Sequence, residues 1–525
     1  MTRKDRIPDH VRDASVKYLN GTINRRTFLK WASAAGISIG VLPGLVRTVK
    51  AQEGAETSAE VAVRVAAENY SGETINMTRE AGLQTQDPEF FSGPLWEELT
   101  GVQTNIIPLT AGPEQYQAHI QEHIAGSGAF DVMDVQPLWM ADYVRAGVLE
   151  PLDDYIAQYM NAGDLEDFPP IYRDLGLFEG VNYGIFDDGD VLVIYYRKDL
   201  FEEHSDAFAD QYGYPLAAPQ NWQQHDQIAK FFTDMMAPDL YGSAFGRAPE
   251  AFWNVEPFLA HFKANGGLLF DADSMDALIN SEAGVRTVAE MAHSNQWMPP
   301  GITELTVIDT FFEWLAGKYA MTYFWPPLGR WSAGLAEGVE AFSFVPESFV
   351  KDVTGYALFP GNISQMAAGF NLCVGSDSPR KELAYLYVQW LTSPEISLQR
   401  VTLPFALRDP YRVSHFDSPE YRSLWDDAGG YLDTLLAAGE NASLDILMPG
   451  GQEYQVAIDR ACTAVYAGTD PQEAMDTAAN EWNDVTERLG VDAQKSAYAS
   501  YLTLGGAYPP SSGSLADAPS NLDVS

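Results

Sequence analysis

Strand-like and helix-like segments alternate in the part of the chain that follows residue 70, and this order limits the choice of fold. Residues 74–78, 102–109 and 130–135 are short apolar runs of the kind that form strands. Residues 94–101 read as a short helix with proline at its start and glycine at its end, and residues 113–125 read as a second helix. Strands and helices that alternate at this spacing predict βαβ units and a largely parallel sheet, hence an α/β fold.

Polar and aromatic side chains follow two of these predicted strands. Gln84 lies in a polar loop after the first strand, and Gln136 and Trp139 follow the third. Ligands of such sheets bind beside the carboxyl ends of the strands. We therefore predict that these three side chains lie near a ligand.

Within residues 184–199, three aspartates directly precede an apolar run. Asp187, Asp188 and Asp190 precede residues 191–196, which we predict to be a buried strand. Charges at this density do not fit inside a strand, so we interpret the aspartates as an exposed turn. A chain of 525 residues is too long for one core. We predict that the turn carries the chain from one lobe to another, with the function in the cleft between them.

The same alternation continues downstream of this turn. The segments that matter here are a helix at 221–236, a helix opened by Trp253, a strand at 320–325 that ends in Trp325 before two prolines, and a strand at 369–374 that contains Asn371. We expect a second crossing between the lobes at residues 322–325 and a third at 369–371.

The N-terminus looks like an export signal. Residues 24–30 (NRRTFLK) resemble a twin-arginine motif, and residues 31–46 carry no charge but are too short and too weakly apolar to span a membrane. A small-residue pattern predicts cleavage after Ala51. The alternative is a basic amphipathic helix. If the N-terminus is an export signal, the mature protein is expected in the periplasm.

The charge and the cysteine count exclude several functions. A formal net charge of -41 repels nucleic acid and anionic membranes, and a solvated acidic coat explains it. The two cysteines, Cys373 and Cys462, do not form a disulfide framework or a zinc site. We favour two buried thiols over a single bridge.

Several motifs, in order across roughly residues 70–490, resemble those of the family 1 extracellular solute-binding proteins of ABC importers, the maltose-binding-like sugar receptors. They are residues 130–134 (FDVMD) with Trp139, 183–185 (YGI), 193–200 (VIYYRKDL), 265–271 (NGGLLFD), 314–325 (WLAGKYAMTYFW), 369–371 (GFN), 378–381 (SPRK), 391–395 (LTSPE) and 403–404 (LP) with Arg408.

The resemblance implies an α/β, two-lobed periplasmic-binding-protein fold with three interlobe crossings and a ligand cleft between the lobes. With the crossings above, the first lobe is expected to comprise residues 68–186 and 326–369. The second lobe is expected to comprise residues 191–321 and 372–505. Residues 506–525, rich in Pro, Ser, Gly and Ala, are expected to form a disordered tail.

The resemblance also implies a receptor that binds a sugar, sugar alcohol or related glycoside and delivers it to a membrane permease as a monomer, with no cofactor, metal or covalent chemistry. Sugars need flat aromatic faces and planar polar groups. The residues that we predict to line the cleft are Gln84, Gln136, Trp139, Asp187, Asp188, Trp253, Trp325, Asn371 and Arg408. The chain departs from the family pattern in two cleft segments: residues 186–188 replace the usual proline loop, and residues 405–411 (FALRDPY) replace a short polar run.

Two other functions are alternatives. Arg408 with Arg330 would suit glycerol phosphate or another small anionic metabolite, although Arg408 would equally pair with Asp409 or a neighbouring glutamate. A secreted polysaccharide-active enzyme is a remote alternative, because the adjacent Asp187 and Asp188 rarely point at one glycosidic bond.

Two patterns imitate metal sites. His119 and His123 lie on one predicted helix face, without a carboxylate partner set by the sequence. Residues 271–282 resemble part of a calcium loop, but they lack the glycine that the loop requires, so a helix-capping turn is favoured.

Overall fold

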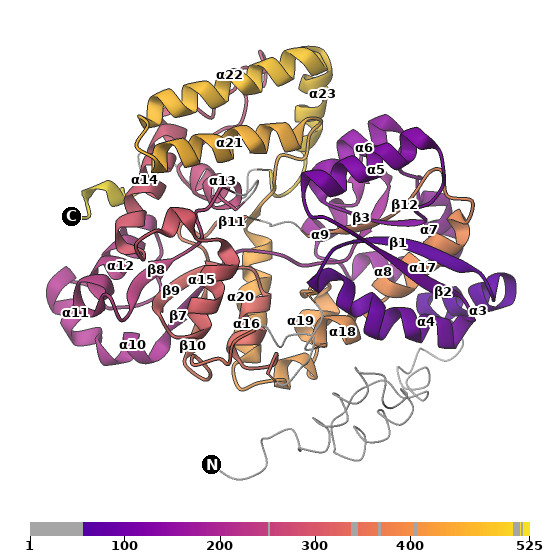
Figure 1. The fold of residues 1–525 in the computed structure, drawn as a ribbon, viewed down its shortest axis with the longest axis horizontal. Coiled ribbons are helices and arrows are strands. Elements are labelled where there is room, and N and C mark those ends of the chain that lie inside the picture. Colours follow the sequence, from indigo (N-terminus) through magenta and orange to yellow (C-terminus); the bar gives the residue numbers. More distant parts are fainter. Residues whose placement is uncertain are drawn as a thin grey trace, which may run out of the picture.

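The computed structural model describes residues 56–249, 253–337, 345–365, 369–403, 407–507, 515 and 518–525. The predicted export signal lies outside the described residues. The described chain forms two α/β lobes, each built around its own sheet, with the first lobe at the right and the second at the left of Figure 1. Along this part of the chain, no helix has the length and hydropathy that a bilayer span requires.

The first lobe contains a five-stranded sheet in the order β2-β1-β3-β12-β6. The strands are β1 (Thr74–Glu80), β2 (Gln103–Leu109), β3 (Val132–Val135), β6 (Gly184–Phe186) and β12 (Asn371–Val374). The first three strands are parallel, as the sequence predicts, while β12 is antiparallel to both β3 and β6.

Helices cover both faces of this sheet and enclose an aromatic core. They are α3 (Ser58–Tyr70), α4 (Gly93–Thr100), α5 (Pro113–Ala125), α6 (Met140–Ala146), α7 (Asp153–Tyr159), α8 (Ala162–Glu166), α9 (Pro170–Asp174), α17 (Lys381–Thr392) and α18 (Pro394–Thr402), with the hairpin β4 (Leu177–Phe178) and β5 (Val181–Asn182) beside them. Trp96 of α4 is fully buried, and its ring centroid lies 5.3 Å from Tyr387 and 5.2 Å from Trp390, so it joins α4 to α17.

The second lobe contains a four-stranded sheet in the order β10-β7-β9-β8. Its strands are β7 (Val193–Arg197), β8 (Tyr241–Ala244), β9 (Tyr319–Phe324) and β10 (Thr354–Ala357). Its helices are α10 (Lys198–Glu203), α11 (Ser205–Tyr212), α12 (Trp222–Met236), α13 (Val255–Ala264), α14 (Glu282–Ser294), α15 (Val307–Leu315), α16 (Pro327–Ser332), α20 (Ala428–Glu440), α21 (Gly451–Tyr466), α22 (Pro471–Leu489) and α23 (Val491–Tyr501). A small sheet of β11 (Ser364–Gln365) and β13 (Ala442–Ser443) and the helix α19 (Val413–Asp417) complete the main elements.

Local sequence explains where several of these helices begin and end. The side chain of Asn221 accepts a hydrogen bond from the backbone of Gln224 and caps α12, which satisfies a free N–H group of its first turn. Gly101 has a positive φ of 75° and ends α4, as predicted, because glycine adopts this left-handed conformation without strain. The predicted bounds of α5 and α12 are confirmed to within one residue.

The expected division into lobes is wrong after residue 326. We expected residues 326–369 in the first lobe, but β10 pairs with β7 of the second lobe. We expected residues from 372 onward in the second lobe, but β12 pairs with β3 and β6 of the first lobe. The reason is that the chain does not cross at residues 322–325: Pro326 and Pro327 turn it into α16, where Ser332 accepts a hydrogen bond from the indole N–H of Trp314 on the same lobe.

In the part of the chain that the structure describes, the backbone crosses from one lobe to the other at three places. We call these the first crossing (residues 187–192, between β6 and β7), the second crossing (residues 358–370, between β10 and β12) and the third crossing (residues 403–427, between α18 and α20). The predicted position at 187–190 falls within the first crossing, and the one at 369–371 lies at the end of the second crossing, where Asn371 begins β12. The third crossing replaces the one expected at residues 322–325.

Both expected ends of the folded region also require correction. Thr57 forms a capping box with Glu60, so a regular helix, α3, begins ten residues before the expected start at residue 68, and it packs against α17. At the other end, residues 521–523 form a short turn that docks on α12 and α14. Asn521 is fully buried there and donates hydrogen bonds to Asp226, Ser294 and the backbone of Glu290. A disordered tail is therefore wrong for the described residues 518–525.

The substitution Asn521→Ala is expected to destabilise the second lobe by about 1–3 kcal/mol, because the carboxylate of Asp226 loses a buried hydrogen-bond donor. Urea unfolding of the mature chain measures this change. Leu522→Ala is the matched control, since Leu522 is 44% exposed, and its effect should stay within about 0.5 kcal/mol. Equal effects of the two substitutions would show that the terminal turn is not docked.

Candidate functional site between the lobes

The strand register brings several of the predicted site residues to one edge of the first lobe's sheet. Asn371 lies opposite both Val135 and Phe186. Gln136 and Asp187 directly follow those two residues, so both lie at the same sheet edge as Asn371. Glu80 ends the parallel strand β1 at this edge as well. The structure thus gathers here side chains that are far apart in the sequence.

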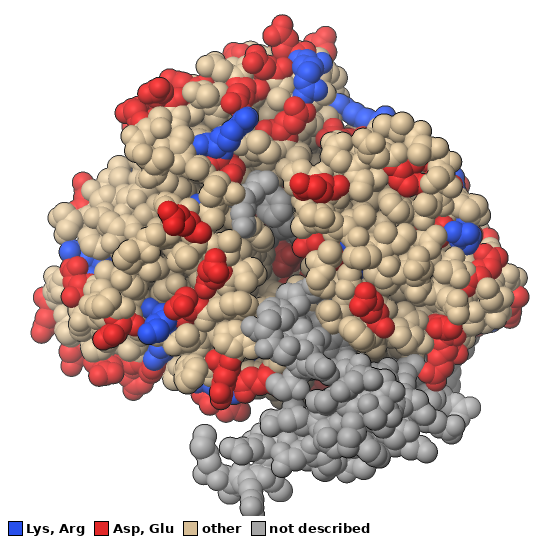
Figure 2. All heavy atoms as spheres, viewed as in Figure 1, with Lys and Arg blue, Asp and Glu red and all other residues tan. Residues whose placement is uncertain are grey.

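An aromatic cluster lies at the corresponding edge of the second lobe's sheet. Trp325 follows the end of β9 and Phe245 follows the end of β8, and their ring centroids are 6.0 Å apart. Trp253, which is partly buried, meets Trp325 edge to face at 4.7 Å. Figure 2 shows the surface hollowed along the boundary of the two lobes, with acidic side chains visible within the hollow.

Trp139 forms a direct contact between the two lobes. It is fully buried in the first lobe, and its indole N–H donates to Oε1 of Gln452 on α21 of the second lobe at 3.0 Å. Its ring packs near Tyr116 and Tyr143. The structure therefore places Trp139 at the lobe interface, with its ring in the core rather than free to stack on a ligand.

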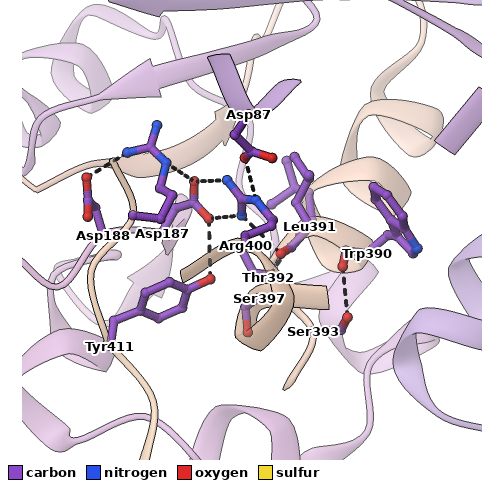
Figure 3. Close-up of polar contacts among 12 residues, drawn as sticks. Asp87, Asp187, Asp188, Trp390, Leu391, Thr392, Ser393, Ser397, Arg400 and Tyr411 are labelled. Atoms are coloured by element: carbon purple, nitrogen blue, oxygen red, sulfur yellow. Dashed lines mark hydrogen bonds and ion pairs between the residues drawn. The ribbon is translucent and has the colours of Figure 1, made fainter. Parts of the chain in front are cut away.

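Asp187 is the centre of a buried network of ion pairs (Figure 3). Its carboxylate accepts hydrogen bonds from Arg400, with an Nη2–Oδ2 distance of 2.9 Å, and from Arg79 at 3.2 Å. Arg408 lies 3.4 Å from the same carboxylate, and the hydroxyl of Tyr411 donates to it at 3.3 Å. Burial acts to raise the pKa of Asp187, but Arg400 and Arg408 outweigh it and hold this pKa below its usual value.

The partners of Asp187 make further pairs that extend the network. Arg400 also pairs with Asp87 at 2.6 Å, and Arg79 pairs with Asp134 at 2.8 Å. All four of these side chains are at most 3% exposed. The arginines belong to β1 and α18, so the network joins the first lobe's sheet to its outer helix and to the first crossing.

Asp188 has its own partners, and together with Asp187 it corrects the expected exposed turn. The carboxylate of Asp188 accepts from Arg408 at 2.6 Å and from the backbone N–H of Asp409 at 2.9 Å. Asp187 is fully buried and Asp188 is 1% exposed. The turn is buried because arginines from distant parts of the sequence neutralise it.

Arg408 and Arg330 are both used within the protein. Arg330 of α16 pairs with Asp409 at 2.7 Å and donates to the backbone oxygens of Val401 and Arg408. Of the two alternatives for Arg408, pairing with an acidic neighbour is the one observed, although the partner is Asp188 and not Asp409. Its Nη2 atom is buried without a hydrogen-bond partner among the described residues.

Other polar atoms at the same sheet edge also lack partners within the described chain. Gln136 is 1% exposed, and neither Oε1 nor Nε2 of its side chain makes a hydrogen bond. Oε1 of Gln84 and Oδ1 of Asn371 are likewise unpaired, whereas Nδ2 of Asn371 donates to the backbone of Leu175. Buried polar atoms without partners are costly, so this edge is suited to a polar ligand.

Sequence reasoning placed Arg79 and Glu80 in the polar loop after the first strand but did not include them among the cleft residues, and it did not select Asp134 or Arg400. Burial and the charge of Asp134 raise the pKa of Glu80 to about 7. Glu80 and Asp134 lie at or next to the carboxyl ends of predicted parallel strands, so the rule that selected Gln136 would also have selected them. Arg400 lies within a helix, and no local pattern marks its pairing with Asp187.

The two sequence patterns that imitate metal sites have structural roles. His119 is buried against Thr78 and Tyr143, and His123 pairs with Asp377, so the two histidines do not share a site. Asp271 accepts from the backbone N–H groups of residues 273 and 274, which confirms the turn, but the turn does not cap the next helix, because α14 begins after Ser281.

Cys373 and Cys462 are both buried and free, so the prediction of two thiols is confirmed.

Comparison with known proteins identifies the family. The model of the bacterial extracellular solute-binding protein family matches residues 82–397, more than half of the chain. The chain belongs to this family. A maltose-bound protein of T. maritima, MalE3, has the same two-lobed fold, with a TM-score of 0.64 and 20% identity over 79% of this chain and 100% of that one.

Two curated relatives carry different ligand names. A probable amino-acid ABC transporter periplasmic-binding protein of Sinorhizobium fredii is 26% identical over 67% of this chain and 75% of its own length. A mannitol-binding protein of Pseudomonas aeruginosa is 24% identical over 51% of this chain and 57% of its own length. The two relatives are thus named for different solutes.

The substitution Asp187→Asn is expected to destabilise the protein by about 3–5 kcal/mol, because it leaves buried guanidinium groups without their charged partner. Since the pKa of Asp187 is lowered on folding, this stabilisation is present near neutral pH and is lost as the pH falls below about 4. Urea unfolding at pH 7 and at about pH 2.5 measures both effects.

The control is Asp427→Asn, which removes a pair with Lys198 whose side chains are 45% and 39% exposed. This surface pair should contribute about 1 kcal/mol or less. Similar losses for the two variants at pH 7 would contradict the central role of Asp187.

Proposed function

We propose that this chain is the substrate-binding component of an ABC importer, and that it binds a sugar, sugar alcohol or related glycoside between its lobes and delivers it to a membrane permease. Membership of the solute-binding family supports the general role. The mannitol and maltose named for two similar proteins support the ligand class. The relative named for amino acids makes the exact solute a question for experiment.

The observation that carries the ligand class is the contrast between the two sheet edges. The first lobe presents amide groups of Gln84, Gln136 and Asn371 that retain unpaired polar atoms. The second lobe presents the rings of Trp253 and Trp325. A polyhydroxylated ligand has hydroxyls for the amides and C–H faces for the rings.

In this proposal, some of the predicted site residues contact the ligand and the others act indirectly. Gln84, Gln136, Asn371 and the free Nη2 of Arg408 bind hydroxyls, while Trp253 and Trp325 stack on the ligand. Asp187, Asp188 and Trp139 act indirectly, because the aspartates hold Arg408 and Trp139 contacts the opposite lobe.

Ligand binding would shift the population toward a closed arrangement of the lobes, since the closed form makes contacts from both sides. The three crossings are the segments about which the lobes would rotate. The chain would carry out no covalent chemistry and would act as an exported monomer, after twin-arginine export and cleavage near Ala51 into the periplasm.

An anionic ligand such as glycerol phosphate fits the geometry less well. Arg330 is paired with Asp409 and donates to backbone oxygens, and Arg408 is paired with Asp188. Glu80 and Asp134 lie at the same edge of the sheet and would repel an anion. A neutral ligand avoids this repulsion.

A thermal-shift panel of neutral sugars, polyols, sugar phosphates and amino acids, applied to residues 52–525, tests the proposal. A neutral sugar or polyol at about 100 times its Kd should stabilise the protein by about 2.7 kcal/mol, which corresponds to a shift of a few degrees. A response to phosphates or amino acids alone would overturn the proposed ligand class, and conversion of the sugar into a product would overturn the non-enzymatic role.

Gln136→Leu in the same assay is expected to reduce the ligand-induced shift, because leucine removes both hydrogen-bonding atoms with little change in volume. Gln158→Leu on the exposed surface of α7 is the matched control and should leave the shift unchanged. An unchanged shift in Gln136→Leu would show that this edge does not bind the ligand.

A further inference from the structure

Three carboxylates from two different crossings meet inside the protein. Asp188 and Asp190 belong to the first crossing and Asp409 to the third, and their carboxylate oxygens lie within 4.8 Å of one another. Asp188 and Asp409 are each 1% exposed, and Asp190 is partly buried. The backbone supports this approach: a side chain on Gly189 would meet the backbone oxygen of Pro410 at 1.9 Å.

These three carboxylates have only two positively charged partners among the described residues. Arg408 pairs with Asp188 at 2.6 Å, and Arg330 pairs with Asp409 at 2.7 Å. No described lysine, arginine or histidine lies within ion-pair distance of Asp190. Three carboxylates and two guanidinium groups therefore leave a net charge of -1 in a buried place, which is unfavourable without a further positive charge.

The other titratable groups that face the carboxylates do not supply that charge. They are Asp187 of the first crossing, Glu256 of α13, Tyr172 of α9, Tyr195 of β7, Tyr421 of the third crossing and Tyr431 of α20. Asp187 adds negative potential, and burial raises the pKa of Glu256 well above its usual value, so neither acid supplies a positive charge. Burial raises the pKa of each of the four tyrosines, so they are neutral at physiological pH.

We propose that Asp190 keeps a proton at neutral pH and donates it to the carboxylate of Asp409, and that this shared proton fastens the first crossing to the third. The hydrogen bond joins the two segments about which the lobes move. Its loss would place two negative charges against each other between the crossings and weaken their contact.

The electrostatic environment agrees with this arrangement. Burial, followed by the charges of Asp188 and Asp409, raises the pKa of Asp190 well above its usual value. Burial also raises the pKa of Asp188 to about 7, but Arg408 and the N–H of Asp409 favour its charged form, so the proton resides on Asp190. Because the folded-state pKa of Asp190 is raised, its contribution to stability is complete at low pH and is lost as the pH rises through that pKa.

Asp190→Asn tests the proposal, because the amide N–H donates to Asp409 as the carboxyl does but does not titrate. We expect the infrared carbonyl band of a protonated carboxyl group, present in the ligand-free mature chain at pH 7, to lose the intensity of one group in this variant. The melting temperature of the natural chain should fall more steeply between pH 6 and pH 9 than that of Asp190→Asn.

Asp199→Asn is the matched control, since Asp199 is partly exposed and pairs with Arg197, which lowers the pKa of this carboxyl. It should change neither the band nor the pH dependence. Asp409→Asn provides a second test that does not depend on the folding of the first variant, and it should likewise remove the steep fall of melting temperature.

Two results would overturn the proposal. One is an unchanged infrared band and an unchanged pH dependence in both Asp190→Asn and Asp409→Asn. The other is one equivalent of metal ion per chain in the purified protein, measured by elemental analysis, with a melting temperature that falls after chelation in the natural chain but not in Asp190→Asn. In that case a metal cation, and not a proton, supplies the missing charge.

Discussion

The burial of the Asp187 carboxylate is the constraint on which the arrangement of this protein depends. A carboxylate removed from water costs several kcal/mol unless charged partners surround it, and here Arg79, Arg400 and Arg408 do so. These arginines come from the first sheet, from α18 and from the third crossing. The first crossing can therefore be buried only when all three segments are in place, which ties the chain order to the fold.

The network also defines which parts of the molecule form a fixed body. Arg79, Asp87, Asp134 and Arg400 all belong to the first lobe, and they hold the start of the first crossing against it. The second lobe contributes Arg330 of α16, which pairs with Asp409. A rotation of the lobes would thus leave the Asp187 network intact and change the environment of the Arg330 pair, since this pair joins the second lobe to the crossings.

The elements that local patterns determine could be predicted from the sequence, and the pairings between distant segments could not. Capping residues and apolar periods located α5 and α12, and the parallel order of β1, β2 and β3 followed from their spacing. The lobes of β10 and β12 depend on strand partners more than 100 residues away in the sequence. The sequence-based prediction therefore assigned each of these two strands to the wrong lobe. The aspartates of the first crossing were interpreted as exposed because no local pattern shows that arginines at positions 79, 400 and 408 neutralise them.

The same network bears on what the cleft can recognise. By pairing the arginines with aspartates, the fold removes most of the positive charge from the edge of the first sheet. The unpaired polar atoms that remain include those of the neutral amides of Gln84, Gln136 and Asn371, beside Nη2 of Arg408 and Oδ2 of Asp134. Amides both donate to and accept from hydroxyl groups, whereas an anion would need unpaired cations. Within a fold that serves many solutes, this internal neutralisation is the structural argument for the uncharged polyhydroxylated ligand that we propose for this chain.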